Sequence, residues 1–245
     1  MHRVLDIDLD FFVDSVAHWV ERDGARLPED EYSSWSPEET MDFLRGRCHL
    51  TGKLPGWVIE HHDEAFARWR DAVGDGMLVP PFHVTHIDAH ADLGLGDAGY
   101  VHLITEVMHR PVEERSLPEV VGPALGFGNW LAFAVACQWV SDLDYVFCPG
   151  GGDDVLGLYM SDDPKGLQLR AATMEQLRQH WSSGGDEPLQ GEADPVVPIC
   201  KIRAEDFSAD GSYDAIVLCR SPSCTPASAD EIFDLIRREF IEEIS

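Results

Sequence analysis

The 245-residue chain has few basic residues: 18 lysines and arginines stand against 45 aspartates and glutamates, giving a formal net charge of −27. A surface this acidic repels the phosphates of nucleic acids and the anionic headgroups of membranes, so we expect neither as a partner. The same charge attracts cations, including the side chains of a partner that carries arginine or lysine.

Long apolar runs are also missing. No stretch approaches the roughly 18 consecutive apolar residues of a transmembrane helix, and the amino terminus lacks the basic and apolar regions of a secretory signal. The six cysteines include no Cys-x-x-Cys pair, and several lie within apolar runs. We therefore expect reduced core cysteines in a cytoplasmic protein, without a disulfide framework or a cysteine zinc site.

A phosphate-binding loop is absent as well. The segment 149–154 is rich in glycine and follows an apolar run, but it lacks the Gly-Lys-Ser/Thr ending of such loops. Its two aspartates, Asp153 and Asp154, would repel a phosphate. An active-site loop and a plain surface turn are both compatible with this segment.

Apolar runs and amphipathic segments alternate along the whole chain. The pattern predicts strands at 4–9, 57–59, 82–87, 145–148, 196–202 and 215–219, and helices at 36–45, 63–73, 129–140, 173–180 and 228–244. Such alternation favours a three-layer α/β/α fold with a largely parallel, doubly wound sheet. The length suits a single domain over residues 1–245.

The segment His86-Ile87-Asp88-Ala89-His90-Ala91-Asp92 follows the predicted strand that starts at Phe82. Asp88, His90 and Asp92 are spaced by two, so extended geometry would direct all three side chains to one face. Burying them is costly unless a metal ion neutralises the carboxylates and binds the imidazole. The alternative is an acidic loop with solvated histidines.

A second acidic cluster opens the chain, where apolar residues alternate with Asp6, Asp8 and Asp10. Carboxylates on one face of a strand repel each other, so this arrangement also calls for a cation. An exposed edge strand with a wet acidic face is the alternative here. A third candidate is the pair His61 and His62 at a predicted strand-to-helix junction, because ligand sites in open α/β sheets lie at the carboxyl ends of strands.

Together these segments provide four carboxylates and two imidazoles, from Asp8, Asp10, His62, Asp88, His90 and Asp92. That set is too large for one zinc with three protein ligands, and it suits two divalent ions that lower the pKa of a shared water. Its many oxygen donors favour manganese or magnesium. Asp6 and His61 are alternatives for one of the six ligands.

These motifs resemble the ureohydrolase superfamily of arginases, agmatinases and related deacetylases. Asp-Ala-His-Ala-Asp at 88–92 is similar to the family's Asp-Ala-His-x-Asp, and Asp8-Leu9-Asp10 is similar to its Asp-x-Asp. In most ureohydrolases the Asp-x-Asp segment comes late, whereas here it comes first, as in a subgroup that includes peptide arginases. Those enzymes convert arginine in ribosomally made precursor peptides to ornithine. Segments 60–63, 86–93 and 220–226 are also similar to motifs of that subgroup.

The resemblance implies an arginase-like fold and a binuclear manganese hydrolase that releases urea from the arginine side chain of a peptide. It implies that Asp8 and Asp88 bridge two Mn²⁺ ions, with His62 and Asp92 on one ion and His90 and Asp10 on the other. Asp92 would also hold the attacking water in line. His102 would pass a proton to the departing amine.

The resemblance leaves the substrate's guanidinium without its expected partner, because the late strand ends Leu218-Cys219-Arg220-Ser221-Pro222 with no acid. Glu60, Asp153 and Asp154 are unranked candidates for that role. The alternative functions are a single-zinc amide hydrolase related to deacetylases, an agmatinase-type enzyme acting on a small guanidine, and a non-catalytic metal-binding protein. The sequence predicts no particular oligomeric state.

Overall fold

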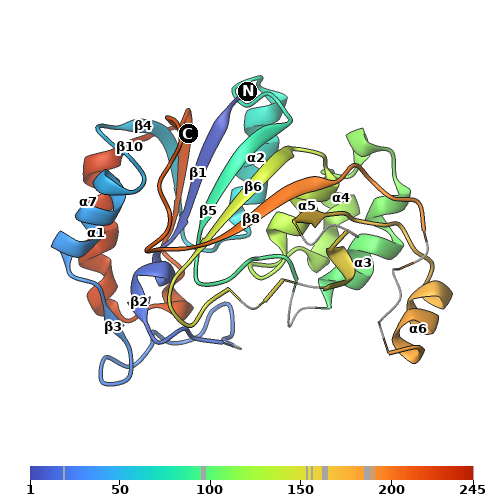
Figure 1. Ribbon diagram of the computed structural model, residues 1–245, viewed down its shortest axis with the longest axis horizontal. Coiled ribbons are helices and arrows are strands. Elements are labelled where there is room, and N and C mark those ends of the chain that lie inside the picture. Colours follow the sequence, from blue (N-terminus) through green and yellow to red (C-terminus); the bar gives the residue numbers. More distant parts are fainter. Residues whose placement is uncertain are drawn as a thin grey trace.

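The computed structural model describes all residues except 19, 95–97, 153, 156, 162–164, 185–188, 190 and 245. Its centre is an eight-stranded sheet in the order β10-β4-β9-β1-β5-β6-β8-β7 (Figure 1). Within the described residues, neighbouring strands run parallel except for the β7–β8 pair. The strands are β1 (Arg3–Asp8), β4 (Leu54–Ile59), β5 (Phe82–Ile87), β6 (Val140–Phe147), β7 (Gly166–Leu167), β8 (Val197–Arg203), β9 (Ala215–Cys219) and β10 (Ile241–Glu243).

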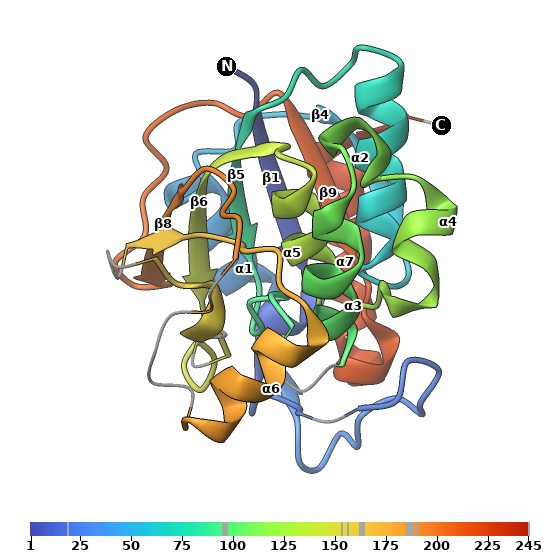
Figure 2. The ribbon, with the colours of Figure 1, turned by 90° about the vertical axis from the view of Figure 1, so that its right-hand side faces the viewer.

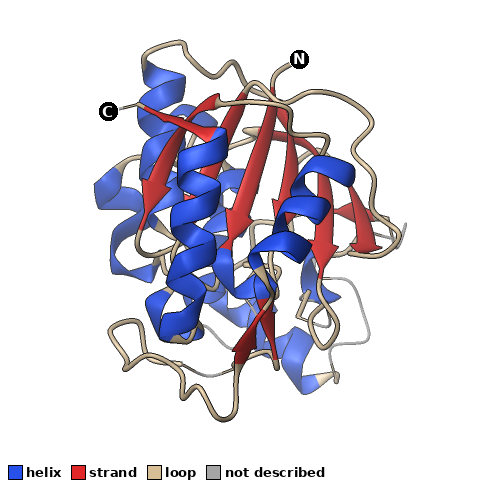
Figure 3. Ribbon diagram, turned by 90° about the vertical axis from the view of Figure 1, so that its left-hand side faces the viewer, coloured by secondary structure: helices blue, strands red, loops and turns tan. Residues whose placement is uncertain are grey.

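Helices cover both faces of the sheet (Figures 2 and 3). One face packs against α1 (Pro37–Gly46) and α7 (Asp230–Phe240), whose buried side chains share a cluster with Leu5 and Ile7 of β1. The other face packs against α2 (Glu64–Gly74), α3 (Gly99–Thr105) and α5 (Trp130–Ala136). The remaining elements are α4 (Pro118–Val121), α6 (Met174–Ser182) and a small hairpin of β2 (Val13–Asp14) and β3 (Ser33–Ser34). The predicted α/β fold with a mostly parallel central sheet is confirmed.

The neighbouring strands β1 and β5 mark the point where the chain reverses its direction across the sheet. From β1 the chain passes through α1 toward β4, whereas from β5 it passes through α3 and α5 toward β6 on the other side. The helices that follow the two strands therefore lie on opposite faces. Such a reversal opens a crevice at the carboxyl ends of the strands, which is where open α/β sheets place their ligands.

The strand register sets four chain segments at the same level of that crevice. Asp6 pairs with His86 and Ile7 with Ile87, so β1 and β5 end side by side. Cys219 of β9 pairs with both Asp8 and Ile59, which brings the ends of β9 and β4 to the same edge. The loops after β1, β4, β5 and β9 thus begin next to one another.

Two predicted helices are too long. The apolar segment at 129–140 forms α5 only to Ala136, because the chain turns at Gln138, whose φ is +56°, and Val140 opens β6. The segment at 228–244 forms α7 only to Phe240, and Ile241–Glu243 instead pairs with the edge of β4. Both segments are continuously amphipathic or apolar, so periodicity alone gives no signal for the break.

Two absences expected from the sequence have structural counterparts. No helix within the described part of the chain is both long and apolar enough to cross a membrane. All six cysteines are described and are free thiols, five of them buried. Cys200 is the exception to the expected core position: it lies on β8 and is exposed.

Candidate metal centre

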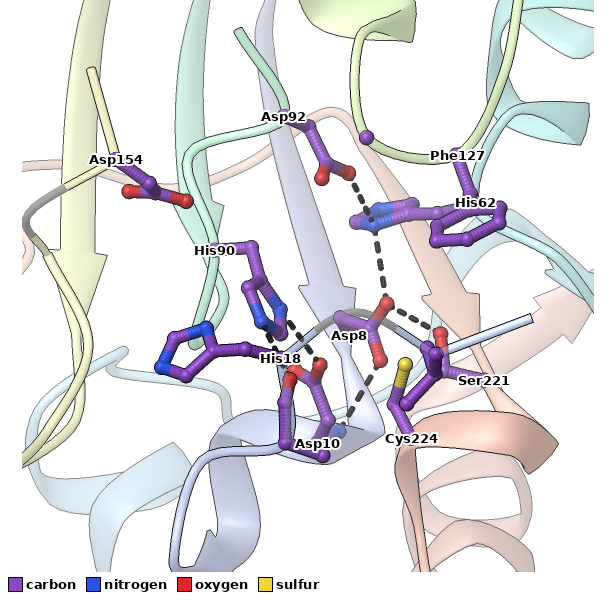
Figure 4. Close-up of a pocket in the computed structure, with 13 residues that line it drawn as sticks. Asp8, Asp10, His18, His62, His90, Asp92, Phe127, Asp154, Ser221 and Cys224 are labelled. Atoms are coloured by element: carbon purple, nitrogen blue, oxygen red, sulfur yellow. Dashed lines mark hydrogen bonds and ion pairs between the residues drawn. The ribbon is translucent and has the colours of Figure 1, made fainter. Parts of the chain in front are cut away.

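All six predicted metal ligands come together at the carboxyl edge of the sheet. Figure 4 shows those that line the pocket, which are all of them except Asp88. Asp8 ends β1, and the chain then turns through a 3-10 helix (Leu9–Phe12) that carries Asp10. The Oδ1 atom of Asp8 caps this turn by accepting a hydrogen bond from the Asp10 amide at 3.1 Å. β5 ends at Ile87, so the three ligands of the 88–92 segment converge through an irregular loop and not through the pleat of a strand.

Two groups that share Asp88 contain five of the six predicted ligands, and the sixth, Asp92, groups with His86 and Asp88. One group contains Asp8, His62 and Asp88, the other Asp10, Asp88 and His90, and within each group one ligand atom per residue lies within 4.8 Å of the others. The Nδ1 atom of His62 is 3.0 Å from Asp88 Oδ2, whereas the Nδ1 atom of His90 is 3.7 Å from Asp88 Oδ1. Asp88 therefore presents one carboxylate oxygen to each group.

Three carboxylates surround His62 Nδ1. Besides Asp88, Asp8 Oδ2 lies at 3.1 Å and Asp92 Oδ2 at 2.9 Å from this nitrogen. On the other side of the cluster, Asp10 Oδ2 lies 3.0 Å from His90 Nδ1. The family resemblance implies that Asp8 bridges two ions together with Asp88, and the structure places Asp8 in one group with His62 and Asp88.

Two buried atoms in this cluster, His62 Nδ1 and Asp88 Oδ2, lie 3.0 Å apart, but neither makes a hydrogen bond of acceptable geometry with any described residue. Leaving such atoms unpaired away from water costs free energy, and a cation bound by both atoms would remove that cost. Carboxylate oxygens and imidazole nitrogens are also ligands that divalent cations accept in proteins. The residues therefore fit a metal site on geometry and on chemistry.

The Asp6 carboxylate contacts the imidazole rings of two histidines, His62 and His86. Its carboxylate oxygens both lie 3.1 Å from His62 Nε2, and its Oδ2 lies 2.6 Å from His86 Nδ1. His86 Nε2 in turn donates to the backbone carbonyl of His90 at 3.1 Å. A carboxylate on one ring nitrogen orients a histidine so that the other nitrogen faces a metal. The same distance criterion also groups Asp6 with His62 and His86, but there His62 uses its Nε2 atom.

His61, the other histidine at this junction, turns away from the cluster. Its Nε2 atom lies 3.6 Å from Asp23 Oδ1. Of the two neighbouring histidines, only His62 is therefore in position to bind an ion in the cluster.

The charges in the cluster oppose one another. Burial raises the pKa of Asp88 to about 8, and the neighbouring carboxylates of Asp10, Asp92 and Asp8 add to the increase. Burial alone would lower the pKa of His90, but Asp10 raises that pKa well above the usual range. Protonated imidazoles thus supply positive charge in the metal-free protein, and a bound divalent cation would displace those protons.

The pKa values of the buried pair Asp6 and His86 shift in opposite directions. Burial by itself would raise the pKa of Asp6, but His62 and His86 lower it to about 2. Burial likewise would lower the pKa of His86, yet Asp6 and Asp88 raise it to about 9. Asp6 and His86 therefore form an ion pair at neutral pH, next to the candidate metal ligands.

Two residues without a predicted role fix the ligand oxygens. Trp130 Nε1 donates to Asp92 Oδ2 at 2.6 Å, and Ser221 Oγ donates to Asp8 Oδ2 at 2.5 Å. Asp92 and Ser221 both have φ in the left-handed region, at +50° and +44°, and strained non-glycine residues concentrate at functional sites. Ser221 belongs to the Arg-Ser-Pro segment of the sequence resemblance, whereas a tryptophan in an apolar helix carries no signal beyond core packing.

A pocket of about 350 Å³ opens over the cluster. Five of the six predicted ligands line it, all but Asp88. The loop after β2 adds Ala17, His18 and Val20, and the remaining described lining residues are Phe127, Gly128, Asp154, Ser221 and Cys224 (Figure 4).

The other predicted site residues differ in whether they line the pocket. His102 lies on α3 with its Nε2 atom 2.7 Å from the Val120 carbonyl, and it is not among the described residues that line the pocket. Glu60 is 52% exposed and pairs with Arg220 at 3.1 Å, also outside the lining. Asp153 lies outside the described residues. Asp154 does line the pocket.

The fold and the cluster together define a class: an α/β protein whose buried aspartate and histidine groups can hold a metal ion. No protein-family model matches the chain, and no curated protein matches it significantly.

Proposed function

We propose that the protein is an arginase-like, binuclear manganese-dependent hydrolase of guanidino groups. Its substrate would be an arginine side chain in a peptide, which is converted to ornithine with release of urea during maturation of a ribosomally made natural product. One observation carries the proposal: Asp88 presents one oxygen to each of two Asp/His groups at the topological reversal of the sheet. The resemblance of the 8–10 and 88–92 segments to ureohydrolase motifs supports the choice of reaction.

Two Mn²⁺ ions bound at the cluster would supply Lewis acidity and lower the pKa of a water molecule that they share. Asp8, His62, Asp88 and Asp92 would hold one ion, and Asp10 and His90 with Asp88 the other. Trp130 and Ser221 keep the ligand oxygens of Asp92 and Asp8 in place, so that little reorganisation is needed.

The chain's own residues would position the reactants. Asp92 would accept a hydrogen bond from the attacking water and keep its oxygen aimed at the guanidinium carbon. In the net reaction that oxygen bonds to the carbon, the bond from the carbon to the side-chain nitrogen breaks, and this nitrogen leaves as a protonated amine. The acidic lining of the pocket and the net charge of −27 both favour approach of a cationic substrate. Six cysteines without a disulfide fit a reducing compartment, and we place the protein in the cytoplasm.

The test is a urea assay on purified protein with measured metal content. We expect about two Mn²⁺ per chain, because two groups of candidate ligands share Asp88. We also expect urea release from arginine-containing peptides, which should stop when the metal is chelated. His90→Ala should lose one ion and the activity, whereas Asp234→Asn, on the exposed face of α7, should keep both.

Two results would contradict this function. Mn²⁺-loaded protein that releases no urea from any arginine peptide or small guanidine would exclude it. A single tightly bound zinc, together with release of acetate from an acylated amine, would point to a deacetylase-type enzyme instead.

A further inference from the structure

We propose that Asp154 binds the cationic group of the substrate, and that the pocket selects a cation that carries no free carboxylate next to it. That the bound group is a guanidinium rests on the proposed function. That Asp154 binds a cation rests on the residues that line the pocket. Asp154 would thus take the place of the acid that is missing after β9.

The first step is the position of Asp154. It is the one described acid of the pocket lining that belongs to none of the metal groups. Its Oδ2 atom accepts a hydrogen bond from the Ala91 amide at 2.6 Å, and Ala91 lies between the ligand residues His90 and Asp92. Asp154 is therefore tied to the metal-binding loop, across the pocket from Ser221 and Cys224 (Figure 4).

The second step is the bonding capacity that Asp154 retains. The Tyr145 hydroxyl lies 3.4 Å from Oδ1 and the Ala91 amide donates to Oδ2, so few donors from other described residues reach this carboxylate. An ionised carboxylate has about four acceptor positions, and the remaining ones suit the parallel N–H groups of a guanidinium or the N–H groups of an ammonium. Glu60, the competing candidate, already pairs with Arg220 and lies outside the lining.

The described lining of the pocket offers no lysine or arginine side chain to a carboxylate. Arg22, Arg26 and Arg220 are not among the described lining residues, and each pairs with an acid: Arg22 with Asp63, Arg26 with Asp230 and Arg220 with Glu60.

A free amino acid would bring its α-carboxylate into this acidic pocket without a cationic partner, and burying such a charge unpaired is unfavourable. An arginine within a peptide, whose backbone has no carboxylate, avoids that cost. The pocket chemistry therefore favours a peptidyl side chain over free arginine.

The test uses three probes that release no urea, so that binding is measured without turnover. Nα-acetyl-ornithine amide carries the side-chain cation alone, Nα-acetyl-ornithine adds only the α-carboxylate, and Nα-acetyl-norvaline amide lacks the cation. Binding to Mn²⁺-loaded protein is measured by calorimetry. The wild type should bind Nα-acetyl-ornithine amide at least about tenfold more tightly than either other probe, because a charge-assisted hydrogen bond is at stake.

Asp154→Asn keeps an oxygen for the Ala91 amide and removes only the charge. We expect this variant to retain its Mn²⁺ content and to bind Nα-acetyl-ornithine amide about 10- to 100-fold more weakly, with unchanged binding of Nα-acetyl-norvaline amide. Asp234→Asn removes one charge far from the pocket and serves as the matched control. Glu60→Gln tests the competing acid.

Three results would overturn the inference: no preference of the wild type for the cationic probe, a change of less than twofold in Asp154→Asn, or loss of Mn²⁺ from that variant, which would show a purely positioning role. Failure of the proposed function is a separate result. In that case no urea forms from arginine peptides, yet the binding pattern of the three probes still reports on Asp154.

Discussion

Asp88 stands between two imidazoles and three other carboxylates, and its raised pKa reflects burial together with repulsion from Asp10, Asp92 and Asp8. Because its ionised form is disfavoured, the Asp88 carboxylate contributes little to the stability of the metal-free fold. The same repulsion among carboxylates favours binding of a divalent ion, because the ion's charge relieves it. The left-handed backbone at Asp92 points the same way, since strain of this kind persists where function requires it.

The variant Asp92→Asn distinguishes a role of Asp92 in metal binding from a role in stabilising the fold. The amide can still accept from Trp130 Nε1, and asparagine tolerates the left-handed backbone, so the fold should survive. One negative charge next to Asp88 is lost, so the melting temperature of the metal-free protein should not fall. Metal affinity should drop at least about tenfold, which at saturating Mn²⁺ reduces the metal-induced stabilisation by about 1.4 kcal/mol.

The measurement is thermal unfolding with and without Mn²⁺, with Asp234→Asn as the control for a lost surface charge. Asp92 would have a structural role instead if its variant melted well below the wild type in chelator. A full Mn²⁺-induced shift in Asp92→Asn would also contradict its assignment as a ligand.

The residues that the structure gathers into the candidate metal site were predicted from the sequence, whereas the residues that hold their side chains in place were not. Alternate spacing of Asp and His after an apolar run marks Asp88, His90 and Asp92 without any structure. Nothing local indicates that Trp130 would reach Asp92 from 38 residues away, or that Ser221 would reach Asp8 across 213 residues. These contacts depend on the strand register, which a single sequence does not encode in any short pattern.

At the scale of elements, the predicted bounds were correct for two strands that are buried along their whole length. β5 and β9 have the predicted bounds, 82–87 and 215–219, because both strands are buried on their two faces and flanked by polar or turn-forming residues. β10 was missed because three residues become a strand only through pairing with Leu54–Gly56 of β4. The pairing partner, and not the local sequence, decides such short edge strands.

The loop after β6 packs directly on the segment that carries the candidate ligands Asp88 and His90. A Cβ atom added to Gly151 would lie 2.4 Å from the backbone carbonyl oxygen of Ala89, a contact that no real side chain makes. Gly151 therefore lets the loop that carries Asp154 approach the segment that carries Asp88 and His90. The close approach links the element that holds the proposed substrate anchor to the one that holds the ligands.

Gly151→Ala should push these two loops apart. We expect a loss of about 1–3 kcal/mol in unfolding free energy, as for other overpacked sites, and a weaker response of the melting temperature to Mn²⁺. Gly157→Ala is the matched control, because its Cβ would meet nothing within 4 Å and its effect should stay within about 0.5 kcal/mol. Equal behaviour of the two variants would show that the contact with Ala89 does not constrain the site.

At the scale of the whole molecule, the balance of charge is the dominant feature. A net charge of −27 disfavours the compact state through self-repulsion, and the cluster concentrates further acids at the carboxyl edge of the sheet. The sequence predicted the acidic character and the α/β class, because both follow from composition and periodicity. It did not predict that His102 and Glu60 would lie outside the pocket, because that depends on how the loops pack.

The pH dependence of stability should change sign when metal binds. In the metal-free protein, the pKa of His86 is raised from 6.5 to about 9, where the ring faces Asp6 on β1, His62 after β4, Asp88 after β5 and Tyr145 on β6. The pKa of Asp88 is raised from 3.8 to about 8. Both groups hold their protons more tightly in the folded state, so the unfolding free energy should fall as the pH rises from 6.5 to 8, by on the order of 2 kcal/mol.

Bound Mn²⁺ needs Asp88 ionised and His62 and His90 without a proton on the ligand nitrogen, so its affinity should rise over the same pH range. The metal-loaded protein should therefore gain stability toward pH 8 while the protein in chelator loses it. Urea denaturation at pH 6.5, 7.2 and 8.0, with chelator and with Mn²⁺, measures both slopes, and His86→Gln should flatten the metal-free one. Parallel slopes in the two conditions would mean that metal binding does not displace protons from this cluster, and the assignment of its ligands would then be wrong.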